Sequence, residues 1–590
     1  MNSGQTTGSP DGRNNGPEPP RCQRSTASQA RSDDDALFPT DDLSSTAKCD
    51  CQHGVSRPSS PASTASRTAY TPPLDRRDEK KDQSLATRIY RFFFRTGPAT
   101  RNADDTAHEP TETSPLLGSG DGRPHISGDA IEAQRGEIID EIDVTWQHEV
   151  KTLTGYAAPL VVTFLLQYLI DISSIIAVGR IGKVELGAVS LANMSASISC
   201  FAVFQGLATS LDTLCAQAYG SGNKHLVGLY CQRMTLFLLC LTIPIAVLWM
   251  NSEYIIMQLV NEAEIASLAS SYLHVLILAL PGYAVFETGK RFLQAQGLFQ
   301  ATTYVLLIGA PINALLQWLL VWKLELGFIG APLSVVITRT LLPILLVLYI
   351  LLFKGSQCWG GFSMRAFSNW WIMIRLALPG MVMIEAEWLA FEILTVISSR
   401  FGTEYLAAQS ILIAATTISY QIPFPVSIAA STRVARLIGA GRVNDAKVAA
   451  RVAVAASLTC TFINFMVYLK FKVQIPLIFT DDEAVAALVS MTLPLVGLAT
   501  FFDGAGVAAH GLLRGIGKQA IGGPANIIAY YLVSLPLAVY FGFALDYKID
   551  GLWMGCTIGL IVVSFIEYAF LLMTDWRKAV LEAVARNAAG

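Results

Sequence analysis

The sequence predicts an all-α polytopic membrane protein, in which twelve transmembrane helices form two six-helix pseudo-symmetric lobes behind a disordered N-terminal tail. Three observations lead to this fold class. Apolar runs fill residues 148–575, these runs repeat at a fixed interval, and residues 1–147 contain no run long enough to cross a bilayer. With 52% hydrophobic and 15% charged residues, the chain is also too apolar for an ordinary soluble protein of 590 residues.

The composition divides the chain into four parts. We expect a disordered cytosolic tail at 1–147, an N-terminal six-helix lobe at 148–355, a C-terminal six-helix lobe at 356–575 and a short cytosolic C-terminal tail at 576–590. The first part is rich in Ser, Thr, Pro, Gly and Asp and poor in aromatic residues. Such a segment cannot bury enough apolar surface to fold alone.

One short motif in the tail suggests a destination. Glu112, Leu116 and Leu117 form the E-x-x-x-L-L pattern of an acidic dileucine sorting signal. This pattern predicts a sorting adaptor as partner and a vacuole-like or lysosome-like membrane, although so short a motif also arises by chance. The plasma membrane therefore stays open as the alternative location.

Twelve apolar segments follow the tail, and each is long enough, at about 20 residues, to span a bilayer as a helix. Prolines inside several of them, such as Pro159 and Pro379, predict bends rather than straight rods. The segments lie near 153–176, 188–216, 227–250, 264–286, 298–322, 329–353, 371–397, 405–432, 447–469, 485–509, 523–547 and 551–574.

The distribution of basic residues predicts the orientation of these segments. The loops after even-numbered segments hold 14 Lys and Arg residues, among them Arg233, Lys290, Arg291, Arg433 and Arg514, and the other loops hold seven. Because loops rich in Lys and Arg stay on the cytoplasmic side, we expect both termini in the cytosol.

An internal repeat relates the two halves. A shift of 220 residues superimposes eight identical residues within the 32 positions of 159–190, including proline, arginine and glycine. Each half holds six segments, an even number, so both halves enter the membrane from the same side. Transporters with this parallel repeat place substrate and ion sites near the middle of the membrane. The matched pairs are Pro159 with Pro379, Val162 with Val382, Leu169 with Leu389, Arg180 with Arg400, Gly182 with Gly402, Leu186 with Leu406, Ala188 with Ala408 and Ser190 with Ser410.

The seventh segment carries an unusual group of acids. Glu385, Glu387 and Glu392 lie within eight residues of an otherwise apolar stretch, next to Trp388. An ionised group at the centre of a bilayer costs roughly 2.5–3.5 kcal/mol, so we expect these acids to face the interior of the bundle or a water-filled cavity. An acidic, aromatic-lined site suits a proton, a metal cation or an organic cation. The alternative is that the glutamates are protonated and only pack one helix against another.

The first half differs at the equivalent position. The 220-residue shift places Gln167 opposite Glu387, and Asp171 follows Gln167 by four residues on nearly the same helix face. We therefore expect the two halves to handle the coupling ion differently. Other polar residues of the apolar segments, Asp212, Arg433, Glu567 and His510, are expected to make structural contacts, and Arg291 and Gln296 to anchor a loop near the lipid headgroups.

Several motifs along 150–575 resemble the multidrug and toxic compound extrusion (MATE) family. Glu387-Trp388 followed by Glu392 is similar to the seventh helix of its eukaryotic branch, and the tail resembles that of fungal members. The strongest motifs are Ser210-Leu-Asp-Thr-Leu-Cys-Ala-Gln-Ala-Tyr-Gly220, Glu404-Tyr-Leu-Ala-Ala-Gln-Ser410, Ser431-Thr-Arg-Val434 with Gly439-Ala-Gly441, and Leu513-Arg-Gly-Ile-Gly517.

The resemblance implies a role for individual acids. Glu387 matches the seventh-helix glutamate that the family uses for proton and substrate binding, Glu392 matches its partner, and Asp503 matches the acid of the tenth helix. Asp171 departs from the eukaryotic pattern and resembles bacterial members, whose first helix carries an aspartate in the cation site. A further glutamate common in eukaryotic members is absent here, where Ala414 lies in that region.

Together these features predict a secondary active antiporter that exports or sequesters organic, often cationic, small molecules in exchange for protons. We expect no catalytic residues, metal site, cofactor or nucleic-acid partner; the partners are the substrates, the coupling cation and the lipid bilayer. The alternatives are a Na⁺-coupled multidrug antiporter or a flippase for lipid-linked precursors. An enzyme, a receptor or a channel fits less well, because no H-E-x-x-H or G-x-S-x-G motif lies in the apolar segments. The coupling and cavity residues are Glu387, Asp503, Glu392, Asp171, Gln167 and Trp388.

Overall fold

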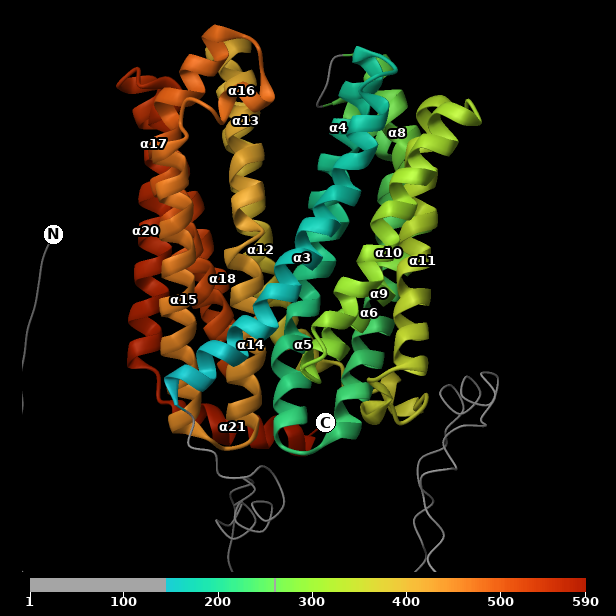
Figure 1. Ribbon diagram of the computed structural model, residues 1–590, viewed down its shortest axis with the longest axis vertical. Helices are drawn as coiled ribbons and strands as arrows, with labels where there is room; N and C mark the ends of the chain where they lie inside the picture. Colours follow the sequence, from blue (N-terminus) through green and yellow to red (C-terminus); the bar gives the residue numbers. More distant parts are fainter. Residues whose placement is uncertain (1–144, 259–261, 590) are drawn as a thin grey trace, which may run out of the picture. The chain divides into compact units, whose positions relative to one another are not determined.

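A computed structural model describes residues 145–258 and 262–589, and throughout this part of the chain the regular structure is helical (Figure 1). The dileucine motif at 112–117 and the rest of the tail up to residue 144 lie outside the described residues. The predictions made for them therefore stay predictions.

Six membrane-crossing helical segments form the first half of the chain. They are α3 (Trp146–Val178); α4 (Lys183–Ala196), η2 (Ser197–Phe201) and α5 (Ala202–Gly220); α6 (Lys224–Met250); α8 (Ala263–Leu276), η3 (Ile277–Ala279) and α9 (Leu280–Ala295); α10 (Gln300–Gln317) and η4 (Trp318–Lys323); and η5 (Gly327–Ile329) with α11 (Gly330–Leu352).

Six corresponding segments form the second half. They are α12 (Trp371–Ser398) and η8 (Ser399–Phe401); α13 (Thr403–Tyr420) and α14 (Pro423–Gly439); α15 (Val443–Lys470); α17 (Glu483–Ile516); α18 (Gln519–Ile527), η9 (Ile528–Ser534), α19 (Leu535–Val539) and η10 (Tyr540–Ala544); and α20 (Lys548–Met573). Short helices lie at the ends and in the link between the halves: α7 (Ser252–Met257), η6 (Ser356–Cys358), η7 (Met364–Phe367), α16 (Pro476–Phe479) and α21 (Trp576–Ala589).

Eleven of the described segments are long and apolar enough to cross a membrane. The twelfth, α12, has the necessary length at 28 residues, but its three glutamates make it more polar than the others. The predicted all-helical, polytopic fold is thus confirmed. At many ends the helices continue several residues past the apolar runs into polar residues.

The 220-residue repeat is visible in where the helices break. A π-helical turn at 197–201 interrupts the second segment, and a turn at 421–422 interrupts the eighth. Gly297 and Gly517, one repeat apart, end α9 and α17 with φ values of +79° and +73°. Glycine adopts this left-handed conformation without steric cost, which explains the same residue at both helix ends.

Two helices, α3 and α12, pack on both halves. The start of α3 buries Leu153 against Phe424 of α14, and Figure 1 shows α3 running from beside α14 toward α10. In α12, Leu376 belongs to the core of the first half and Leu394 to the core of the second. Each half therefore begins with a helix that crosses to the other.

The halves meet at one end, where α5 contacts α12, α14 and α17 and where α21 contacts α5. Glycine makes this approach close. A Cβ atom on Gly220 would lie 2.0 Å from the carbonyl oxygen of Arg436, and one on Gly439 would lie 2.1 Å from that of Gln217. Both distances are far below van der Waals contact.

Most of the basic residues counted on loops are in helices instead, and five of these lie well inside a helix. Arg233 lies in α6, Lys290 and Arg291 in α9, Arg433 in α14 and Arg514 in α17, and all except Arg433 are fully buried. The loop assignment of these residues was wrong, because each cation has a polar partner that allows it to lie inside the protein. Gln296, also expected near the headgroups, is buried as well. The excess of basic residues on one side is therefore smaller than the sequence suggested, and the orientation stays a prediction.

The segment 576–589, expected as a short tail, forms helix α21. Its buried face includes Trp576, Ala579 and Ala583, which pack with α14, α15 and α17. At its end, Arg586 donates a hydrogen bond of 2.9 Å to the side chain of Gln217 in α5. Helix α21 therefore contacts both halves at the end where they meet.

Candidate functional site

The second half contains a pair of acids on facing helices. Glu387 of α12 is only 4% exposed, and its carboxyl group lies close enough to that of Asp503 in α17 for the two to interact by a hydrogen bond and by charge. Asp503, Val507, His510 and Arg514 follow the 3.6-residue period, so they form one stripe along α17 that faces the interior.

A second acid and a histidine lie next to this pair. His510 Nε2 lies 3.1 Å from Oε1 of Glu567 in α20, and Glu567 is fully buried. His510 also acts on Asp503 by its charge, and Glu567 acts on Glu387. Arg514, one turn further along α17, donates a hydrogen bond of 2.6 Å to Ser427. We call Glu387, Asp503, His510 and Glu567 the second-half acid cluster.

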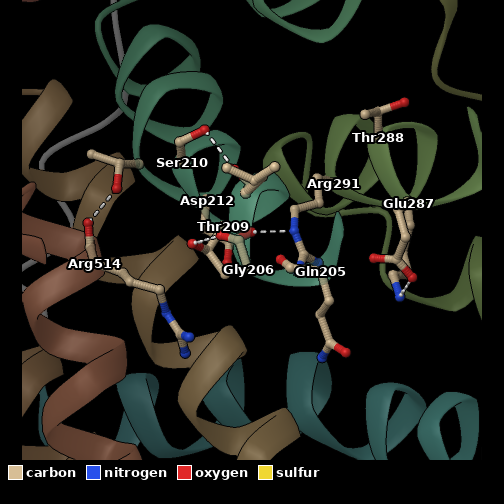
Figure 2. A network of polar contacts seen from close by, with 12 residues as sticks. Gln205, Gly206, Thr209, Ser210, Asp212, Glu287, Thr288, Arg291 and Arg514 are labelled. Carbon is tan, nitrogen blue, oxygen red and sulfur yellow. Dashed lines mark hydrogen bonds and ion pairs between the residues drawn. The ribbon is translucent and has the colours of Figure 1, made fainter. Parts of the chain in front are cut away.

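Buried acids of the first half have a different arrangement, because each pairs with Lys or Arg. Lys290 Nζ lies 2.6 Å from Glu287 Oε1, and Arg291 Nε lies 3.3 Å from Asp212 Oδ1. Figure 2 shows Asp212 facing Arg291, with Arg514 of the other half on its opposite side. These contacts confirm that Asp212 has a structural partner inside the protein.

A further acid of the first half, Asp171 in α3, has the same kind of partner. Its carboxylate forms an ion pair with Arg339 of α11, with 2.7 Å between Asp171 Oδ1 and Arg339 Nη2. Glu287, Asp212 and Asp171 therefore each have a Lys or Arg partner. In the second-half acid cluster, by contrast, the ion pair found among the described residues is that of His510 with Glu567, and histidine is charged only when protonated.

A cavity of about 310 Å³ lies between the halves. Its size is in the range of small-molecule sites. The Asp171 side chain is 47% exposed because it opens into this cavity, although protein surrounds it. The lining comprises Tyr168, Asp171, Ile172, Ser174, Ile175, Asn193, Ser197, Phe201, Leu276, Val335 and Arg339 of the first half, and Ser410, Ile413, Ala414 and Thr417 of the second.

The residues singled out in the sequence are thus distributed over two places. Glu387 and Asp503 lie together in the second half. Gln167 lies with Asp171 in the first half, beside a small hollow that Arg339 also lines. Its Oε1 is 3.5 Å from Lys290 Nζ.

Glu392 is on α12 but does not act on the acid pair, and Trp388 follows Glu387 directly on the same helix. Among the described residues, the charges that act on Glu387 come from Asp503, Glu567 and Arg514 and not from Glu392. At about 100° per residue, Glu392 lies about 140° around the helix from Glu387, so the two side chains point to different sides.

Three residues of the buried ion pairs were missed or misplaced by the sequence reasoning. Lys290 and Glu287 fell at the edge of a segment whose helix extends further than the apolar run, and Arg339 was not considered. The repeat contained a signal for one of them, because a 220-residue shift places Lys290 on His510.

Comparisons with known proteins agree with this architecture. The sequence profile of the MatE family matches residues 159–319 and 379–540, which are the two repeats. An uncharacterized transporter of Saccharomyces cerevisiae is 40% identical over 82% of this chain and 70% of its own length. Multidrug and toxin extrusion protein 1 of Xenopus tropicalis is 35% identical over 75% of this chain and 77% of its own. A crystal structure of a eukaryotic MATE transporter is similar with a TM-score of 0.72 and 29% identity, covering 75% of this chain and 99% of the other.

Proposed function

The chain belongs to the MatE family of membrane transporters, and from that premise we propose that it is an antiporter that exchanges organic small molecules, often cations, for protons. The protein is a multi-pass membrane transporter and not an enzyme. The two halves alternate between opening to one side of the membrane and to the other, around a site between them.

The observation that carries the proposal is that, among the described residues, neither Glu387 nor Asp503 forms an ion pair with Lys or Arg, and Arg514 acts on Glu387 by its charge without forming such a pair. Two ionised carboxylates in contact repel each other, and charges removed from water are costly unless they are neutralised. The three first-half acids meet this requirement with Arg or Lys. The second-half acid cluster meets it by binding protons or a cation from outside the chain.

A shared acid site explains obligatory exchange. A proton bound at Glu387 or Asp503 removes the negative charge that attracts a cationic substrate, so proton and substrate compete. Binding of one favours release of the other, and this linkage is reciprocal. Tyr420 and Tyr530 lie near both acids and add the aromatic surface that an organic cation prefers.

The test is uptake of a fluorescent organic cation into proteoliposomes across an imposed pH gradient. We expect Glu387→Gln and Asp503→Asn each to reduce gradient-driven uptake by at least about tenfold, since each removes an ionisable group buried at membrane depth. The matched control is Glu404→Gln, the same change at an exposed position of α13, which leaves uptake unchanged. Glu392→Gln shows whether the second glutamate of α12 takes part, as the family resemblance implies.

Other gradients separate this proposal from its alternatives. Uptake that persists without a pH gradient and follows an imposed Na⁺ gradient would show that the coupling ion is Na⁺ and not the proton. Movement of a labelled lipid-linked precursor with no gradient would favour the flippase. Wild-type-like uptake by both Glu387→Gln and Asp503→Asn would contradict the proposed coupling site.

We also propose that the end of the molecule with Trp146 and α21 faces the cytosol. In that orientation the described conformation is closed to the cytosol, because the halves meet at this end. The assignment to a vacuolar membrane, rather than the plasma membrane, and to a sorting adaptor depends on residues 112–117.

A further inference from the structure

We propose that the cavity between the halves selects zwitterionic substrates, and that the ion pair of Asp171 with Arg339 in its wall makes this selection. The inference rests on the proposed transport function and names the chemical class that the cavity takes. Its basis is the geometry of this pair and of the surrounding wall.

The pair is held rigidly in place. Asp171 on α3 and Arg339 on α11 approach to 2.7 Å. The guanidinium carbon of Arg339 lies 3.9 Å from the ring centre of Phe201 and 4.7 Å from that of Tyr283. Such cation–π contacts fix a guanidinium in orientation as well as in position. The two charges therefore present a fixed dipole to the cavity.

Both members of the pair can still bind a ligand. Asp171 is the more accessible, at 47% against 7% for the Arg339 side chain, and both line the cavity. One oxygen of Asp171 bonds to Arg339, while the other accepts no hydrogen bond from the described residues. The Nε atom of Arg339 is buried and has no hydrogen-bond partner in the described part of the chain. The pair thus still offers a hydrogen-bond acceptor on Asp171 next to a donor on Arg339.

A fixed pair of opposite charges discriminates by the charge pattern of the ligand. A simple cation is attracted by Asp171 but repelled by Arg339, and the reverse holds for an anion, so each gains little. A zwitterion places a positive group near Asp171 and a negative group near Arg339, and both contacts are favourable. Binding also leaves the total charge of the site unchanged, which avoids a buried uncompensated charge.

The rest of the cavity fits a zwitterion with an apolar side group. Asn193, Ser410 and Thr417 offer neutral hydrogen-bond donors and acceptors. Val335 and Ile413 form apolar parts of the wall. The first-half pair thus adds selection by charge pattern to the competition between proton and substrate at the second-half acid cluster.

Three probes that share a phenylethyl group test the charge pattern: phenylalanine as the zwitterion, phenethylamine as the cation and 3-phenylpropanoate as the anion. Their binding to the purified full-length protein in lipid nanodiscs is measured at neutral pH from intrinsic tryptophan fluorescence. We expect phenylalanine to bind about tenfold more tightly than either analogue, which corresponds to one net charge-assisted hydrogen bond.

Substitutions in the pair give expectations of opposite sign. Arg339→Gln leaves Asp171 alone and shifts the preference to the amine, whereas Asp171→Asn leaves Arg339 alone and shifts it to the acid. The double variant Asp171→Asn/Arg339→Gln leaves no unpaired charge, so it tests the proposal even where a single variant fails to fold. We expect it to bind the three probes with similar affinity. Arg436→Gln removes another guanidinium that stacks on a ring, that of Tyr219, and leaves the preference unchanged.

Two results would overturn the selection of zwitterions. One is a wild type that binds the amine most tightly, and the other is a set of variants that weaken all three probes equally, as expected for a purely structural ion pair. The binding assay uses no gradient, so it is independent of antiport. Zwitterion binding without any pH-driven uptake would contradict the proposed function and leave this inference intact.

Discussion

His510 occupies the position in the second half that Lys290 occupies in the first. Each residue contacts a buried glutamate, at 3.1 Å for His510 with Glu567 and 2.6 Å for Lys290 with Glu287. Lysine carries a permanent charge at neutral pH, whereas the charge of histidine changes in the physiological range. The two halves thus share a backbone position at which one carries a lysine and the other a histidine, each paired with a buried glutamate.

Replacing this histidine tests the difference. We expect His510→Lys to move the pH dependence of gradient-driven uptake to more acidic pH by about one unit or more, because a permanent cation next to Asp503 and Glu567 opposes proton binding. The profile is measured in proteoliposomes from pH 5 to 8. The matched control is Lys290→Arg, which preserves the charge in the first half. An unchanged profile in His510→Lys would separate His510 from the coupling site.

Cys358, in the link between the halves, provides a chemical measure of burial outside the membrane. Burial favours the neutral thiol over the thiolate and raises the pKa of Cys358 to about 11. Because the thiolate is the reactive form, alkylation should accelerate about tenfold per pH unit without a plateau up to pH 10. Rates are obtained by mass spectrometry of the Cys358 peptide. The urea-unfolded protein should instead approach a plateau near the ordinary thiol pKa, and a plateau below pH 9 in the folded protein would show an accessible thiol.

Individual acids of the site could be predicted, but their partners could not. Glu387 is conspicuous because an ionisable residue stands out in an apolar run. Arg339 also lies in such a run, yet its partner Asp171 is 168 residues away, and no local pattern joins them. Pairing depends on the packing of α3 against α11, which is a property of the folded chain.

Close contact between α5 and α14 depends on two glycines. We expect Gly439→Ala to lower the free energy of unfolding by about 1–3 kcal/mol, since its Cβ would lie 2.1 Å from the carbonyl oxygen of Gln217, and backbone cannot yield as a side chain does. Thermal unfolding followed by tryptophan fluorescence gives the change. Gly187→Ala in α4 is the control, because the nearest atom there is the flexible end of Ile265 at 3.4 Å. Equal stability of the two variants would show that the halves are not tightly packed here.

Helices as elements were predicted well because hydrophobic length is a strong signal in a membrane protein. Their interruptions were not, because the π-helical turns at 197–201, 318–323 and 528–534 have no single breaking residue in common. Helix α21 was missed for a related reason. Its apolar face is short and gains stability from packing on α14 and α17 rather than from its own sequence.

For the whole molecule, the exchange of helices between halves connects them at one end. The start of α3 packs on α14 and α15, although the rest of α3 belongs to the first half. Pro159 lies within the part of α3 that packs on the second half, since Phe164 beyond it still contacts Phe424 of α14. The proline removes the backbone hydrogen bond to the carbonyl of Gly155, which makes the helix easier to bend there. The repeat places Pro379 at the same point of α12. Rocking of the halves is therefore expected to bend both helices at their prolines.

A buried ion pair holds the start of α3 on the second half. Arg433 of α14 donates hydrogen bonds from Nε to both carboxylate oxygens of Glu149, at 3.2 and 2.9 Å, and its Nη2 also contacts Glu149. Glu149 is almost fully buried. Loss of one partner from a buried pair costs about 3–5 kcal/mol, because the other charge remains uncompensated, whereas loss of both costs less.

Loss of Arg433 alone should therefore open the closed end more than loss of both Glu149 and Arg433. With spin labels on the exposed residues Lys224 and Lys447, one in each half, we expect Arg433→Gln to transfer population to longer distances in pulsed electron paramagnetic resonance. In the double variant Glu149→Gln/Arg433→Gln, part of the population should return to the shorter distances of the wild type, since no charge remains unpaired. Asp445→Asn, which breaks the 2.5 Å pair with Arg442 within one half, serves as control and should leave the distances unchanged. Identical distances in all variants would mean that α3 does not hold the halves together, and the glycine contacts of α5 and α14 would then account for closure.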